Sequence, residues 1–447
     1  MRTFYKRLYP FKAIFNWLNQ DHVPTPLFTQ REFAFTLSND AYLRYQSFNN
    51  ADDMKKQVLA MNPTRFEIGP MYSAKPRDRK LLRPGNFTPQ KRELVFDIDM
   101  TDYDPVRTCC SGADICRRCW GFITAAVKVI DAAIRDQYGY EHLLWVYSGR
   151  RGIHLWISDQ EAMELTDDQR RAIVNWLTVV PPSSKGEGKK INVRIGNRPV
   201  PACIRDAIEE LKTIFAELIL EDQDCFASEE GYETLLRLIP DGSIVATLTE
   251  RWQDDPHRSS VDKWEDIRKE MKKYERNSRE RTIMTNALED IVLQYTYPRL
   301  DTEVSKHRNH LLKAPFCIHP KTGRVCVPVN PAEIDTFDPM AVPTVQQLLR
   351  ELDEASAGEG VGAGEEREHD YEKTSLKPYV DMLEKHNSSI INQARRGKKP
   401  AEGEFFDIIS LSTFAEKAVR SFLVIRTALG YSDCMRSSRC SLALLVY

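Results

Sequence analysis

The chain has 447 residues, of which 42% are hydrophobic and 29% charged, with a formal net charge of −2. This length allows two or three domains with a sizeable core, and the composition excludes a fibrous or wholly disordered protein. No apolar run approaches the length of a membrane span, so we expect no contact with a membrane.

The first twenty residues are basic and contain no acid, a composition that also suits a transit peptide. Apolar residues recur at helical spacing from Phe4 to Leu18, however, which favours a core-packed first helix. Residues 31–37 and 42–48 follow as strand-like or mixed segments.

The stretch ELVFDIDMTDYD, residues 93–104, begins as a short buried strand and then places Asp97 and Asp99 two positions apart. Two carboxylates at this spacing on a strand point to the same face and repel each other. A pair of metal ions, a phosphoryl group with one metal, or plain solvent would each relieve that repulsion.

The same residues fit the D-x-D-x-T motif of haloacid-dehalogenase-type phosphatases. There the first Asp is a phosphoryl-accepting nucleophile and the second an acid/base. Ser148, at the end of the apolar run LLWVY, would supply the phosphate-binding hydroxyl. The phosphatase, the metal-dependent enzyme and the solvated pair all remain open on these residues alone.

A cysteine cluster follows: CCSGADICRRC contains four of the ten cysteines of the chain. Clustered cysteines in a chain without a secretory signal bind metal more often than they form disulfides. Four thiolates complete a tetrahedral zinc site with no open position, which makes a zinc ion here structural. The expected ligands are Cys109, Cys110, Cys116 and Cys119.

Residues 122–140 have helical spacing, and residues 142–158 form the clearest hairpin pattern of the chain. Its turn reads SGRRGIH. Gly149 and Gly152 allow close approach of the backbone to a ligand, Arg150 and Arg151 suit phosphate, and His154 can donate to it. This composition favours an anion site over an exposed basic turn.

The middle of the chain has helical patterns, which favour a helical insertion. A polar loop at 181–190 lies near the start of this insertion. A second hairpin is predicted over 316–329, with its turn at Pro320–Gly323. Residues 351–373 carry nine acids and two bases, which predicts a disordered acidic linker. The expected helices of the insertion are 204–220, 232–239, 264–277 and 282–295.

Taken together and in this order, these blocks resemble the catalytic small subunit of the archaeal–eukaryotic DNA primases, specifically the eukaryotic branch. The resemblance rests on ELVFDIDMTDYD, the cysteine cluster, VYSGRRGIH and LDTEVSKHRNHLLKAPFCIHPKTGR, and it spans roughly residues 1–350. TSLKPYV, residues 374–380, also resembles a family segment. The tail from 409 onward does not.

The resemblance implies an α+β primase-polymerase fold with an inserted all-helical subdomain and a zinc-binding motif. It implies a DNA-directed RNA polymerase that makes short RNA primers on single-stranded DNA from ribonucleoside triphosphates. Asp97 and Asp99 then bind two Mg²⁺ or Mn²⁺ ions with Asp301 as the third carboxylate. The implied nucleotide-binding residues are Glu32, Arg44, Ser148, Gly149, Arg150, Arg151, Gly152, His154, Asn309, His310, Lys313 and His319.

Arg65 stands where the vertebrate pattern has Lys. The implied partners are the primer–template, the iron–sulfur large primase subunit and the DNA polymerase α complex, in the nucleus. We expect no iron–sulfur cluster in this chain. The expected organisation is a catalytic domain at 1–180 and 291–350, a helical subdomain at 181–290, the linker at 351–373, a helical segment at 374–408 and an atypical tail at 409–447.

Two rivals explain less of the sequence. A phosphatase requires a later GDxxxD-type acidic pair, which the chain lacks, and has no place for the cysteine cluster. A non-catalytic zinc protein that binds nucleic acid explains the cysteines and arginines but gives Asp97, Asp99 and Asp301 no use.

Overall fold

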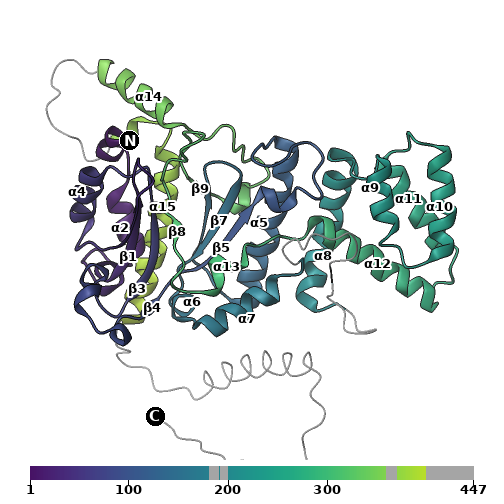
Figure 1. The fold of residues 1–447 in the computed structure, drawn as a ribbon, viewed down its shortest axis with the longest axis horizontal. Helices are drawn as coiled ribbons and strands as arrows, with labels where there is room; N and C mark the ends of the chain where they lie inside the picture. The colour runs from purple at the N-terminus through teal and green to yellow at the C-terminus, as the bar shows by residue number, and fades with distance from the viewer. Residues whose placement is uncertain (181–190, 192–199, 359–369, 399–447) are drawn as a thin grey trace, which may run out of the picture. The chain divides into compact units, whose positions relative to one another are not determined.

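The computed structural model describes residues 1–180, 191, 200–358 and 370–398, and residues Met1–Ala394 form one compact unit. Figure 1 shows strands and helices mixed along this unit, the α+β class that the sequence predicts. No helix in these described ranges is long and apolar enough to cross a membrane. The predicted tail 409–447 lies outside the described residues.

The N-terminal region forms two helices where the sequence predicts one. Pro10 separates them, because proline lacks the amide hydrogen that a continuous helix requires and disfavours helical backbone in the residue before it. The apolar residues from Phe4 to Leu18 are buried as expected. The helices are α1 (Arg2–Arg7) and α2 (Phe11–Asn19), followed by α3 (Pro26–Thr29) and α4 (Ala51–Met61).

Two antiparallel sheets carry the site. The first has the strand order β2-β1-β3-β4, with β8 also pairing with β3, and the second has the order β5-β7-β6-β9. The first sheet consists of β1 (Arg31–Thr36), β2 (Tyr42–Gln46), β3 (Arg65–Tyr72), β4 (Pro89–Lys91) and β8 (Leu312–Lys313). The second consists of β5 (Leu94–Asp99), β6 (Leu143–Tyr147), β7 (Gly152–Ile157) and β9 (Pro328–Val329).

A buried ion pair joins the two sheets. Arg31 on β1 donates through both terminal nitrogens to Glu93, at 2.8 and 2.9 Å, and Glu93 directly precedes β5. Burial alone would raise the pKa of Glu93, but Arg31 and Arg92 hold it below its usual range. The carboxylate therefore stays ionised and fixes the start of β5 against the first sheet.

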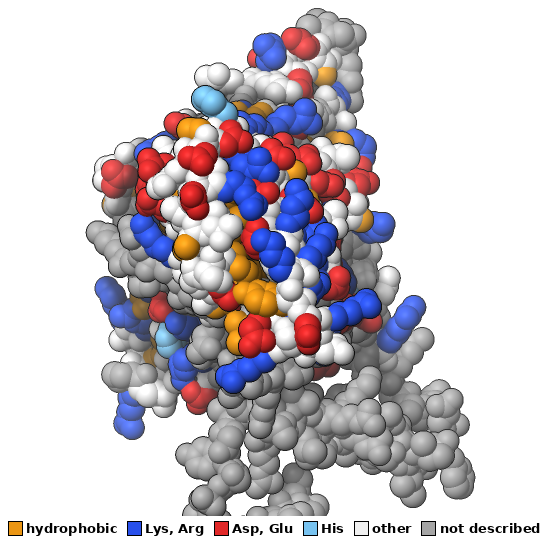
Figure 2. All heavy atoms as spheres, turned by 90° about the vertical axis from the view of Figure 1, so that its right-hand side faces the viewer, with side chains coloured by type: hydrophobic (Ala, Val, Ile, Leu, Met, Phe, Trp, Pro, Cys, Tyr) orange, Lys and Arg blue, Asp and Glu red, His pale blue; other side chains and the backbone are white. Residues whose placement is uncertain are grey.

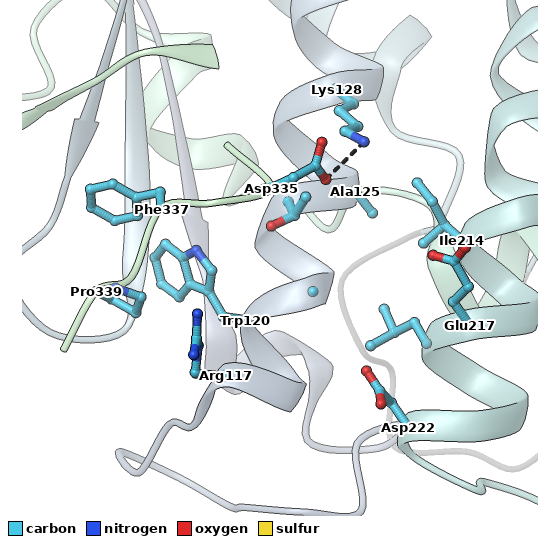
Figure 3. Close-up of a pocket in the computed structure, with 13 residues that line it drawn as sticks. Arg117, Trp120, Ala125, Lys128, Ile214, Glu217, Asp222, Asp335, Phe337 and Pro339 are labelled. Atoms are coloured by element: carbon cyan, nitrogen blue, oxygen red, sulfur yellow. Dashed lines mark ion pairs between the residues drawn. The ribbon is translucent and has the colours of Figure 1, made fainter. Parts of the chain in front are cut away.

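The helical middle of the chain lies against α5, the helix that follows the cysteine cluster (Figure 1). Gly121 makes this contact close, because a side chain there would meet Leu218 at 2.8 Å. A cavity of about 200 Å³ lies beside this contact, with the Lys128–Asp335 ion pair at its edge (Figure 3). The cavity is separate from the acidic residues of β5.

The helices of this region are α5 (Arg117–Tyr138), α6 (Gln160–Glu164), α7 (Asp167–Leu177), α8 (Ala202–Ile214), α9 (Glu229–Leu236), α10 (Gly242–Asp254), α11 (Ser260–Lys272), α12 (Arg279–Thr296) and α13 (Thr302–Lys306). Residues Phe215–Asp222 continue α8 as a π-helix. The predicted helices are present, and α6, α7, α10 and α13 are helices that the sequence patterns did not predict. The predicted polar loop at 181–190 lies outside the described residues.

The acidic linker is shorter than the sequence predicts. Residues 351–358 belong to α14 (Val345–Gly358), and Asp370–Lys373 form a 3₁₀ helix. Leu348 and Leu352 bury one face of α14, so its acids occupy the exposed face of a packed helix. Residues 359–369 lie outside the described residues. The chain continues as α15 (Lys377–Lys398) within the predicted helical segment.

Candidate active site

Asp97 and Asp99 occupy the end of β5, where their main chains face His154 and Gly152 of β7. Ile98 between them is fully buried, while the two carboxylates retain 25% and 35% exposure. This is the alternation that the strand prediction requires. Gly152 permits the pairing, because a Cβ atom there would lie 2.4 Å from the Ile98 carbonyl oxygen.

Asp301 joins this pair from a distant part of the sequence. Its amide donates to the carbonyl oxygen of Asp97 at 3.0 Å, and its side chain begins α13 by accepting from the Glu303 amide at 3.0 Å. The structure thus brings the third predicted carboxylate to β5. The sequence contained no local signal for this contact beyond the motif resemblance.

The three carboxylates form a region of unbalanced negative charge. Burial, together with the charges of Asp99 and Asp301, raises the pKa of Asp97 to about 7. The neighbouring His154 ring lies 3.6 Å from Asp97, and burial, with Lys313 nearby, lowers its pKa to about 3. A cation between the carboxylates would remove this repulsion.

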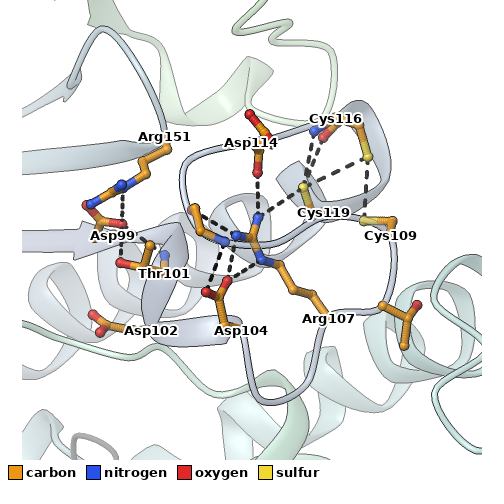
Figure 4. Close-up of polar contacts among 12 residues, drawn as sticks. Asp99, Thr101, Asp102, Asp104, Arg107, Cys109, Asp114, Cys116, Cys119 and Arg151 are labelled. Carbon is orange, nitrogen blue, oxygen red and sulfur yellow. Dashed lines mark hydrogen bonds and ion pairs between the residues drawn. The ribbon is translucent and has the colours of Figure 1, made fainter. Parts of the chain in front are cut away.

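Arg151 neutralises part of this charge. Its Nε atom donates to both oxygens of Asp99, at 2.7 and 2.9 Å, while Thr101 donates its amide and hydroxyl to the same carboxylate (Figure 4). Thr101 therefore orients Asp99, and Arg151 occupies the position of a counter-ion. Arg151 is also one of the residues predicted to bind phosphate.

The turn between β6 and β7 brings the predicted phosphate-binding residues together. The Ser148 hydroxyl accepts from the Gly152 amide at 3.0 Å, and Gly149 adopts a φ of +86° with a Cβ position only 2.8 Å from His319. Lys313 of β8 donates to the Ser148 carbonyl oxygen. A lysine of the first sheet thereby reaches the turn of the second sheet.

The pKa of His319 reflects the positive charge of this region. Burial lowers its pKa to about 4, and four cations act in the same direction. A neutral ring surrounded by cations is suited to an anion rather than to a further positive charge. The four cations are Lys313, Arg150, Arg65 and Arg151.

Glu32 and Arg44 form a second polar group on the first sheet. Arg44 donates to both oxygens of the buried Glu32 at 2.8 and 3.1 Å, and Tyr72 donates to the same carboxylate at 3.0 Å. Arg44 also reaches the Asn309 carbonyl oxygen at 3.4 Å. His310 is exposed beside Asn309, with its ring nitrogen 2.9 Å from the Leu311 carbonyl oxygen.

The four clustered cysteines converge as predicted: their four Sγ atoms all lie within 4.8 Å of one another. Burial raises the pKa of Cys110 to about 12 and that of Cys119 to about 11, whereas hydrogen bonds lower the pKa of Cys116 to about 7 against the effect of burial. Deprotonation of Cys110 and Cys119 at neutral pH therefore requires a cation. Gln223 of the helical region donates to Cys109 Sγ at 3.4 Å and accepts from the Thr108 amide at 2.8 Å. The cluster thus contacts the inserted helices.

The sequence reading missed Asp102. Burial and the charges of Asp99 and Asp301 raise its pKa to about 6, so it belongs to the same acidic region (Figure 4). Its position three residues after Asp99 was the available signal. Glu67 lies opposite Lys313 in the β3–β8 pair and accepts a hydrogen bond from Tyr42 at 2.5 Å, outside this acidic region.

The antiparallel pairing of β5 argues against the phosphatase alternative, which requires a Rossmann-like domain with parallel strands. A family model described as DNA primase small subunit matches residues 96–331. The chain is 46% identical to the DNA primase small subunit of Schizosaccharomyces pombe, covering 90% of this chain and 92% of that protein. The Saccharomyces cerevisiae protein of the same name is 39% identical, with 88% and 91% covered.

The DNA primase small subunit of Drosophila melanogaster is 37% identical, with 90% of this chain and 92% of that protein covered. Among solved structures, the polymerase domain from Mycobacterium tuberculosis Ligase D in complex with DNA aligns with a TM-score of 0.34 and 9% identity, covering 83% of this chain and 90% of that one. The relatives and the matched model show that the chain belongs to the DNA primase small subunit family.

Proposed function

We propose that Asp97, Asp99 and Asp301 hold the two divalent cations, Mg²⁺ or Mn²⁺, with which this primase subunit makes short RNA primers on single-stranded DNA. Its membership of the primase family gives the reaction class, a nucleotidyl transfer. The main support for these three residues is the hydrogen bond from the Asp301 amide to the Asp97 carbonyl oxygen, which brings Asp301 to the strand that also carries Asp99. Oxygen ligands of this kind are those that Mg²⁺ and Mn²⁺ prefer.

Bound there, the two cations would lower the pKa of the attacking 3′-hydroxyl and stabilise charge on the α-phosphate. The protein's own residues prepare for this. Thr101 fixes Asp99, and the main-chain bond fixes Asp301 relative to Asp97. With a cation and a triphosphate bound, Arg151 would exchange its contact with Asp99 for the phosphates.

The turn of the second sheet and Lys313 form the triphosphate side of the site. Arg150 and Arg151 offer planar donors, Ser148 offers a hydroxyl, and Gly149 and Gly152 remove the side chains that would block close approach. His154 and His319, neutral because of their lowered pKa values, can donate a hydrogen bond to phosphate oxygens. These donors stabilise the charge of the departing pyrophosphate.

The Glu32–Arg44 pair, with Asn309 and His310, forms the ribose side of the site in this proposal. Support comes from the contact between Arg44 and Asn309, which joins the first sheet to the segment that follows α13. Arg65 stands near His319 and takes the place of a lysine. Its planar guanidinium gives it a different contact geometry from a lysine ammonium.

The four cysteines hold a structural Zn²⁺ in this proposal, because the thiolates fill a tetrahedral shell. The small-subunit family also implies a large-subunit partner. We propose that this partner is the iron–sulfur large primase subunit, that both act with the DNA polymerase α complex, and that they act in the nucleus. The domain organisation with boundaries at 180, 290 and 350 belongs to the same proposal; positions 290 and 350 lie within α12 and α14, so these two boundaries fall at the ends of those helices.

Primer synthesis on poly(dT) with ATP and Mg²⁺ or Mn²⁺ tests this function. The purified chain yields short oligoadenylates, and Asp99→Asn reduces their rate more than about a hundredfold through loss of a cation ligand. Asp114→Asn is the matched control, since Asp114 is an exposed acid of the zinc loop. Full activity of Asp99→Asn would contradict the cation assignment.

A further inference from the structure

Residues 75–83, called here the basic segment, carry five cations and one acid and contact β2 of the first sheet. Arg77, Arg79, Lys80 and Arg83 are exposed, and Pro76–Leu81 form a 3₁₀ helix. Lys75 and Arg77 donate to the uncharged side chain of Asn49, at 3.2 and 2.9 Å. Among the described residues no carboxylate pairs with these five cations. Within the described part of the chain, their charge is therefore left to an external anion.

The basic segment adjoins the proposed nucleotide site through Tyr45. The Arg79 guanidinium lies 4.0 Å from the centre of the Tyr45 ring, and the Arg44 guanidinium lies 5.0 Å from it. Arg44 is the residue that pairs with Glu32 and reaches Asn309. Tyr45 itself has a φ of +63°, and its amide donates to Glu32 at 3.2 Å. Tyr45 thus lies between Arg79 of the basic segment and Arg44 of the proposed nucleotide site.

Aromatic rings accompany these cations. Phe87 stacks on Tyr72, with ring centres 4.0 Å apart and planes within 6°, and meets the Tyr45 ring edge-on at 6.1 Å. Tyr45 and Phe87 are only partly buried. Cations that follow a backbone beside rings on which bases stack are the combination that single-stranded nucleic acid binds.

Cations elsewhere in the described part of the chain are in many cases paired with carboxylates. Figure 2 shows the end of the helical region, where Lys and Arg side chains alternate with Asp and Glu. Several of these form ion pairs, such as Arg258 with Asp266 at 2.6 Å and Arg268 with Glu265 at 3.7 Å. The basic segment differs from these pairs because no carboxylate of the described residues pairs with its cations and because it lies next to the site.

We propose that the basic segment binds the sugar–phosphate backbone of the single-stranded DNA template as it approaches the nucleotide site, an inference that rests on the proposed primase function. The template is the favoured occupant because it is held before any primer exists. The triphosphate has its own cations at Arg150, Arg151 and Lys313. The segment's cations supply affinity without sequence preference, as phosphate contacts do.

The test is a salt series of oligo(dT) binding, read by fluorescence anisotropy on the full chain. The variant replaces three exposed cations: Arg77→Ala, Arg79→Ala and Lys80→Ala. Each lost phosphate contact reduces the slope of log affinity against log salt by about 0.7, so the triple variant loses about 2. The matched control removes three exposed cations of α11 and the turn after it, Lys269→Ala, Lys272→Ala and Arg276→Ala, and keeps the slope.

Lys80→Glu, a single change at an exposed position, shows the same direction and serves if the triple variant fails to fold. An unchanged slope in these variants, or an equal loss in the α11 control, would overturn the proposal. Weaker binding of a primer–template duplex with unchanged oligo(dT) binding would assign the segment to the primer and also overturn it. A wild-type chain that binds DNA through this segment but makes no primer would refute the proposed function instead.

Discussion

The Asp301 amide donates to the Asp97 carbonyl oxygen at 3.0 Å, which places the start of α13 against the end of β5. The Asp301 side chain also caps α13 through the Glu303 amide. One residue therefore has a structural contact through its main chain and cap, and a proposed cation contact through its charge. These two contributions can be separated.

Asp301→Asn keeps the cap and removes the charge, because asparagine caps helices as well as aspartate. We expect the free energy of unfolding to change by less than about 0.5 kcal/mol while primer synthesis falls more than about a hundredfold. Asp301→Ala should add a loss of about 1 kcal/mol from the missing cap. Denaturant unfolding and primer assays measure the two effects. Retained synthesis in Asp301→Asn would show that its charge is not used.

Arg151 and a divalent cation compete for Asp99, since the guanidinium now contacts both carboxylate oxygens. Arg151→Ala should therefore bind Mn²⁺ more tightly than the wild-type chain in the absence of nucleotide, while its KM for ATP rises. Isothermal titration with Mn²⁺ and steady-state kinetics measure these effects. Arg150→Ala is the control: it should raise the KM and leave Mn²⁺ affinity unchanged. Weaker Mn²⁺ binding in Arg151→Ala would contradict this competition.

Gln223 connects the cysteine cluster to the helical region, and its side chain is 2% exposed. Gln223→Ala removes the acceptor of the Thr108 amide, and because Thr108 is exposed and water can replace that acceptor, the loss is about 0.5–1.5 kcal/mol in the free energy of unfolding. We expect the variant to keep its zinc, because no thiolate is removed. Thermal unfolding with metal analysis checks both points, and a stability equal to that of the wild-type chain would show that the contact is dispensable.

The zinc assignment predicts about one equivalent of tightly bound zinc per chain. Cys119→Ser should lose this zinc and unfold at lower temperature, because metal binding contributes directly to folding. Cys225→Ser is the control, since Cys225 is buried and donates to the Val106 carbonyl oxygen at 3.1 Å. Mass-spectrometric metal analysis measures the zinc content of both variants. Equal zinc contents in the two variants would contradict the four-cysteine site.

His386 on α15 makes stability depend on pH. Burial, with His142 and Arg135 nearby, lowers its pKa to about 3, against 6.5 for an ordinary histidine. The unfolded state then binds the proton more readily, so stability falls as pH drops below about 6.5, by up to about 2 kcal/mol at pH 5. His386→Phe should flatten this part of the profile. An unchanged slope between pH 5 and 7 in urea unfolding would contradict it.

Much of the site is readable from sequence because it lies in short contiguous motifs. The alternation of β5 placed Asp97 and Asp99 on one face, and the glycines of the SGRRGIH turn marked a close approach that Gly149 and Gly152 now show. The four cysteines were close in sequence, so their convergence needed little tertiary information.

Contacts between distant segments could not be read in this way. Nothing local to Lys313 indicates that a two-residue strand of the first sheet carries it to Ser148 of the second. The acidic composition of 351–358 indicated disorder, because composition does not register the buried stripe that Leu348 and Leu352 form. Pro10 was a readable signal that the first helix divides, and the apolar periodicity obscured it.

The central claim is that Asp97, Asp99 and Asp301 hold the catalytic cations. Crystals of the chain with Mn²⁺, a template and a non-hydrolysable ribonucleotide triphosphate test it most directly through the anomalous scattering of manganese. We expect two manganese peaks among these three carboxylates, with Arg151 moved from Asp99 to the phosphates. Manganese bound elsewhere, with Arg151 still on Asp99 beside the bound nucleotide, would contradict it.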